Sequence, residues 1–94
     1  MATLTTFVTV PPRVLFRDLG EEAVILELES GRYYGLNEVA TRMWLRLLHH
    51  GRVASACQDL LEEYEVAEGR LRKELLGFVD ALAAQGLLQL HDAP

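Results

Sequence analysis

Apolar and polar residues alternate along the first third of the chain with the period expected of β-strands. Residues 5–10 and 13–17 are rich in β-branched, aromatic and aliphatic side chains, and two prolines separate them, so they predict one interrupted strand or two short ones. Residues 23–29 predict the next strand, with Val24, Leu26 and Leu28 alternating on one side. Residues 32–36 predict a further strand.

A hairpin is expected between the last two of these strands. A two-residue turn would place Glu29 opposite Arg32. That register places Tyr33 opposite Leu28 and puts Tyr34 and Leu36 on the other face. We expect Tyr34 and Leu36 to face the core, because Leu36 leads directly into a helix packed beneath the sheet. A slip of one residue would exchange the two faces, so the assignment depends on the register.

From Asn37 onward the apolar period changes to that of an α-helix, and three helices are predicted. Asn37 is a helix N-cap and Gly51 a helix stop. The first helix has an apolar face made of Ala40, Met43, Trp44, Leu47 and Leu48. A second helix follows from Val53 to Tyr64, and a third covers residues 68–85.

The third helix carries two apolar rows, more than a single core contact requires. One row is Leu71, Leu75, Phe78 and Leu82, and the other is Leu76, Val79 and Ala83. Gly77, in the middle, should cost about 1 kcal/mol relative to alanine, so we expect a neighbour that approaches the helix backbone closely.

The order of these elements indicates the fold class. Strands followed by three helices predict an α+β domain of winged helix-turn-helix-like order, with a three-stranded antiparallel sheet followed by three helices. A chain of 94 residues forms one domain, 1–94, whose core we place at about residues 13–88.

Charge and cysteine content narrow the possible functions. Nine Lys and Arg against fourteen Asp and Glu give a net charge of −5, which argues against general binding of nucleic acid or anionic membranes. The single cysteine excludes an internal disulfide and fits a reducing compartment. With neither a signal peptide nor a run of membrane-spanning length, a cytoplasmic protein is expected.

The candidate chemistry does not indicate an enzyme. Cys57 lies on the apolar face of its helix, where a buried structural thiol is expected. His49 and His50 are adjacent, so they point to different sides of a helix, and we expect no metal site, no catalytic residues and no cofactor.

Three binding functions remain. Arg70, Arg72 and Lys73 would serve a DNA-binding winged-helix regulator. However, Glu68 is spaced to pair with Arg72 and Glu74 with Arg70, which neutralises much of this charge. Alternatively, the Tyr33-containing last strand leaves an open edge to which a peptide could add as a strand. The tyrosines could equally cap the core, and an adaptor that docks a partner protein through this edge is a third possibility.

A family resemblance favours the peptide-binding interpretation. The passage GRYYGLNEVATRMW, followed by Glu-Tyr-x-Val at residues 63–66 and Ala-x-x-Gly-Leu-Leu at 83–88, resembles the PqqD-like family, also called the RiPP recognition element. The resemblance covers roughly residues 13–88. Its most specific part is Gly-x-Tyr-Tyr-x-Leu-Asn at residues 31–37, with Trp44 on the helix that follows.

The resemblance implies a non-catalytic peptide chaperone that binds the leader of a ribosomally made precursor by strand addition to its third strand. It implies these peptide-binding residues: Arg32, Tyr33, Tyr34, Gly35, Leu36, Leu71, Leu75, Phe78, Val79 and Leu82. A lasso-peptide pathway is implied, with a leader peptidase and an ATP-dependent macrolactam-forming cyclase as partners. Pyrroloquinoline quinone assembly is the alternative pathway. Arg52 and Ala67 depart from the usual polar helix caps, which leaves the starts of the second and third helices open.

Overall fold

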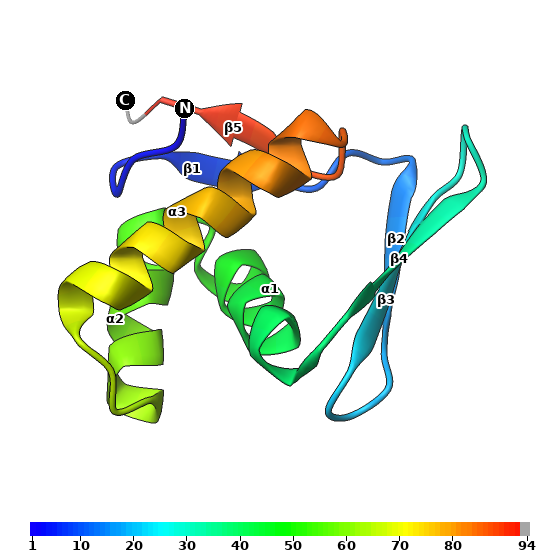
Figure 1. Cartoon of the computed structure of the whole chain (residues 1–94). Coiled ribbons are helices and arrows are strands. Elements are labelled where there is room, and N and C mark those ends of the chain that lie inside the picture. The colour runs from blue at the N-terminus through cyan, green and yellow to red at the C-terminus, as the bar shows by residue number, and fades with distance from the viewer. Residues whose placement is uncertain (93–94) are drawn as a thin grey trace.

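Three helices follow a three-stranded sheet in the computed structural model, which describes residues 1–92 (Figure 1). The sheet has the order β2 (Val14–Asp18), β3 (Ala23–Glu27) and β4 (Arg32–Leu36), and it is antiparallel throughout. The helices are α1 (Glu38–His50), α2 (Val53–Glu63) and α3 (Glu68–Ala84). The predicted fold class is confirmed.

The two ends of the described chain form a second, two-stranded sheet. β1 (Phe7–Thr9) pairs antiparallel with β5 (Gln89–His91), with Val8 opposite Leu90. The prolines at 11 and 12 therefore separate two strands that belong to different sheets. Figure 1 shows this pair above the helices, whereas the β2–β4 sheet stands at the right-hand side of α1.

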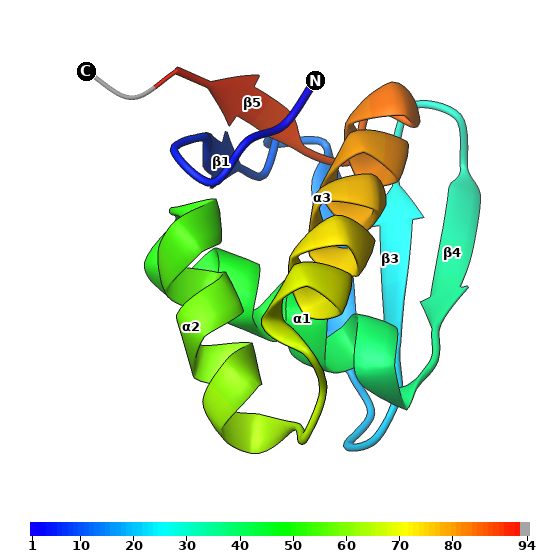
Figure 2. The same ribbon diagram turned by 60° about the vertical axis from the view of Figure 1, so that its left-hand side comes forward.

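Trp44 of α1 lies at the centre of the core. Its side chain is fully buried, and the ring of Phe16 on β2 meets it edge to face with the centroids 5.8 Å apart. The other large, fully buried aliphatic side chains come from β3, all three helices and the segment before β5: Ile25, Leu47, Leu60, Leu75, Leu87, Val53 and Val79. The helices thus cover one face of the β2–β4 sheet, as Figure 2 shows from a second side.

The predicted hairpin register was wrong by two residues, and the predicted faces nevertheless hold. Glu27, not Glu29, lies opposite Arg32, and a four-residue turn closes with the Gly31 N–H bonded to the Glu27 carbonyl at 2.9 Å. Because side chains alternate with a period of two, a shift of two residues keeps every face. Leu36 is buried and Tyr34 half-buried.

Glu27 determines this turn, because its carboxylate binds the turn backbone. It accepts hydrogen bonds from the Glu29 N–H (2.9 Å), the Ser30 N–H (2.9 Å) and the Ser30 hydroxyl (2.6 Å), and Arg13 lies 3.6 Å away. The Ser30 hydroxyl above all, then the two backbone N–H groups and the Arg13 charge, hold the pKa of Glu27 below its usual 4.5.

We expect this carboxylate to make folding stability depend on pH. Because its pKa is lower in the folded state, its contribution is complete above 4.5 and is lost as the pH falls through the lower folded value. Glu27→Gln should flatten the acid side of the stability curve, measured by urea unfolding between about pH 3 and pH 7. Glu29→Gln, at an exposed position, is the control. Equal acid sensitivity of wild type and Glu27→Gln would contradict this role.

The N-terminal segment supplies the cap that the sequence of α2 lacks. Arg52 precedes α2 without a side-chain capping bond, and the first helical N–H groups of Val53 and Ala54 instead donate to the carbonyls of Thr6 and Leu4, each at 3.0 Å. Ala67 likewise gives α3 no side-chain cap. The helix starts at Val53 and Glu68 agree with those predicted.

Gly77 does not meet the close neighbour expected from its position in α3. A Cβ atom built there would have nothing within 4 Å, and the residue is exposed.

Every helix within residues 1–92 is too short or too polar to cross a lipid bilayer.

Candidate functional site

β4 presents an open backbone edge. All five of its residues are paired with β3, and among residues 1–92 no other strand pairs with β4. Arg32, Tyr33 and Gly35 are exposed, with Tyr33 retaining 73% of its accessible surface. The unpaired N–H and C=O groups along such an edge can accept a further strand.

The C-terminal end of α3 meets β4 through one hydrogen bond. The Tyr34 hydroxyl donates to the side-chain oxygen of Gln85 over 3.3 Å, so this end of the helix lies against the inner face of β4. Helical periodicity places Phe78 and Glu74 on the same side of α3, seven and eleven residues before Gln85. We call the open edge of β4 together with this side of α3 the β4–α3 surface.

The predicted residues of α3 differ in how far they can reach a ligand. Leu75 and Val79 are fully buried in the core, and Leu71 and Leu82 retain only 4% and 6% of their surface. Phe78 is half-buried. Phe78 is therefore the predicted residue of α3 with appreciable free surface, while the four aliphatic residues hold the helix in place beneath it.

A hollow of about 160 Å³ lies where the starts of α1 and α3 and the end of α2 come together. Its lining includes Val39, which is 46% exposed and follows β4 by three residues, and Val66, which is 42% exposed. Arg70 and Glu74, paired at 3.2 Å, also line it. The sequence pattern does not predict this hollow, because its residues come from three helices and the α2–α3 connection, whereas helical periodicity reports only the faces of one helix at a time.

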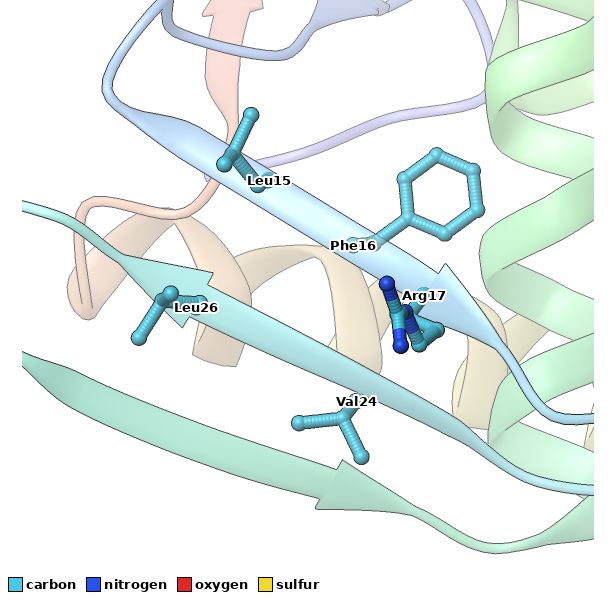
Figure 3. Close-up of a pocket in the computed structure, with 5 residues that line it drawn as sticks. All are labelled: Leu15, Phe16, Arg17, Val24 and Leu26. Atoms are coloured by element: carbon cyan, nitrogen blue, oxygen red, sulfur yellow. The ribbon is translucent and has the colours of Figure 1, made fainter.

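The face of the β2–β4 sheet away from the helices is also apolar. Leu15, Leu26 and Tyr33 lie side by side across the three strands, as do Arg17, Val24 and Gly35. A hollow of about 440 Å³ lies over β2 and β3; Figure 3 labels the residues that line it, of which Leu15, Arg17, Val24 and Leu26 are on this side, while the ring of Phe16 reaches toward α1. We call this side the outer face. Val24 and Leu26, which the alternation grouped together, lie here, whereas Ala23, Ile25 and Glu27 face the core.

Several titratable side chains make structural contacts. His50 bonds to Asp59, and this bond holds the pKa of Asp59 below its usual value while joining α1 to α2. Burial raises the pKa of the Cys57 thiol, which disfavours the reactive thiolate. Within residues 1–92 no three His, Cys, Asp or Glu side chains gather as a metal site. Arg70 pairs with Glu74, as the helical spacing predicted, whereas the structure of residues 1–92 has no ion pair between Glu68 and Arg72.

Comparisons with known proteins agree with this architecture. A family model described as coenzyme PQQ synthesis protein D (PqqD) matches residues 22–88. No curated protein matches the chain.

Two solved structures share the fold. One, TbiB1 in complex with the TbiA(beta) leader peptide, is 30% identical with a TM-score of 0.81, and the match covers 85% of this chain and 93% of that one. The other, a lasso peptide synthetase B1 complexed with the leader peptide, is 27% identical with a TM-score of 0.79 and covers 87% and 96%. The family match spans most of the chain, and the chain therefore belongs to the PqqD family.

Proposed function

We propose that this protein is a non-catalytic peptide chaperone of lasso-peptide biosynthesis. It binds the leader segment of a ribosomally made precursor on the β4–α3 surface. It then presents the precursor to a leader peptidase and to an ATP-dependent macrolactam-forming cyclase.

The open edge of β4 is the observation that carries this proposal. β4 has β3 on one side only within the described residues, and the half-buried ring of Phe78 lies on the same side of α3 as the Tyr34–Gln85 contact. The likeness to two proteins whose structures contain leader peptides supports a peptide as the ligand.

Strand addition explains how one small domain combines affinity with choice of partner. Main-chain hydrogen bonds to β4 supply affinity with little regard to sequence, and pockets for alternate side chains supply specificity. Successive side chains of the added strand alternate between its two sides. One set would point toward Phe78 and α3, and the other set would lie on the same side as the outer face of the sheet.

A fluorescence titration tests the proposal. We expect a labelled synthetic leader, taken from the precursor encoded beside this chain, to bind saturably with one peptide per protein, and a shuffled peptide of the same composition to bind more weakly. Absence of saturable binding would refute leader recognition. A leader carrying proline within the bound segment should bind weakly, because proline removes a main-chain donor. Full affinity of every such peptide would refute strand addition alone.

A further inference from the structure

Gly35, in the middle of the open edge strand, is not required by the fold. Its φ angle is not positive, so the backbone conformation is open to any residue, and a Cβ atom built there would meet nothing within 4 Å. Glycine inside a strand weakens it, because it adds conformational entropy to the unfolded state and packs no side chain. A β-branched residue would suit the strand better.

The missing side chain leaves a gap in the outer face. Gly35 lies opposite half-buried Val24, and exposed Tyr33 is the neighbour two residues earlier on the same face. Val24 also lines the apolar hollow that Figure 3 shows. At Gly35, therefore, no β4 side chain stands between the open edge and Val24, which is one of the residues that line the hollow.

From this geometry we infer that the bound leader carries a large apolar side chain, aromatic or long aliphatic, that crosses over Gly35 and packs against Val24. The inference rests on the proposed function and adds to it a specificity contact on the outer face. The leader residue paired with Gly35 projects to this face in a parallel or an antiparallel register, because paired residues share a face.

The distance from the added strand to Val24 determines which class of leader side chain can make this contact. Strands are spaced by about 4.8 Å, so the backbone of an added strand lies about 10 Å from β3. A small side chain would end above β4, whereas an aromatic or long aliphatic one spans the gap to Val24. The surroundings are apolar apart from Arg17 on the same cross-strand row, so a charged side chain would lose hydration without a close partner.

Adding a side chain at position 35 tests this inference. Gly35→Val should fold with unchanged or higher thermal stability and should weaken binding of the labelled leader by about tenfold or more. Gly35→Ala should lie between it and the wild type. Thr9→Val, which places a valine on exposed β1 in the other sheet, is the control and should bind like the wild type.

A second measurement locates the contact without any substitution in the protein. In the wild-type complex, nuclear Overhauser effects should connect the protons of one large leader side chain to the Val24 methyl groups. Alanine at that leader position should weaken binding to the wild type but cost little further with Gly35→Val, since the two changes remove the same contact.

The outcomes separate the inference from the proposed function. If the wild type binds the leader and Gly35→Val binds it equally well, or if the Val24 methyl groups show no contact with the leader, the inference is wrong and leader binding stands. If the wild type does not bind the leader, both are wrong.

Discussion

Replacing Trp44 with alanine is expected to remove about 3–5 kcal/mol of folding stability, the cost of deleting a large buried aromatic side chain. Its indole is fully buried on α1 and packs edge to face against the ring of Phe16 on β2. A loss of this size is a large part of the total stability of a small domain, so the variant should unfold at a much lower urea concentration than the wild type. Urea unfolding followed by circular dichroism measures the effect.

Trp44→Phe is the matched control, because it keeps a ring in the same site. The Trp44 Nε1–H has no hydrogen-bond partner among the described residues, so phenylalanine also removes a buried unsatisfied donor. We therefore expect a clearly smaller loss for phenylalanine than for alanine. A Trp44→Ala protein within about 1 kcal/mol of the wild type would show that this ring does not hold the sheet on α1.

Replacing Phe78 with alanine is expected to weaken leader binding by about 30-fold, or about 2 kcal/mol, if Phe78 is the aromatic anchor of the β4–α3 surface. Phe78 is half-buried and lies on the same side of α3 as Gln85, whose side chain accepts a hydrogen bond from Tyr34 of β4. The labelled leader used for the wild type measures the affinity, and circular dichroism confirms that the variant is folded.

Leu76→Ala separates binding from folding. Leu76 is also half-buried on α3 but lies roughly on the opposite side of the helix from Phe78. Both substitutions should reduce stability, and only Phe78→Ala should reduce affinity strongly. Equal losses of affinity from the two variants would place the peptide elsewhere.

The local pattern of apolar and polar residues was sufficient to predict the β2–β4 sheet and the three helices. Alternation in strands and the period of about 3.6 residues in helices report which face of each element is buried. It was insufficient for the turn after β3. The choice between two and four turn residues depends on the carboxylate of Glu27, which bonds to the Ser30 hydroxyl and two turn amides. The β1–β5 pairing was also missed, because strands of three residues, separated by most of the chain, carry little local signal.

The candidate site was predicted from sequence only in part. The open edge follows from strand order, but the two apolar rows of α3 could not show which side looks toward β4. The Tyr34–Gln85 contact gives that orientation, and it separates Phe78 from fully buried Leu75 and Val79. Gln85 could have been suspected from its spacing of seven residues after Phe78.

The pairing of β1 with β5 has a consequence for the modular use of this domain. Because Phe7 lies opposite His91, the two ends of the described chain lie close together, and Figure 1 shows β1 and β5 above the helices with β4 at the right. A second protein fused at either end would therefore be attached well away from β4. The domain could be joined to another polypeptide in either order while the open edge of β4 remains accessible.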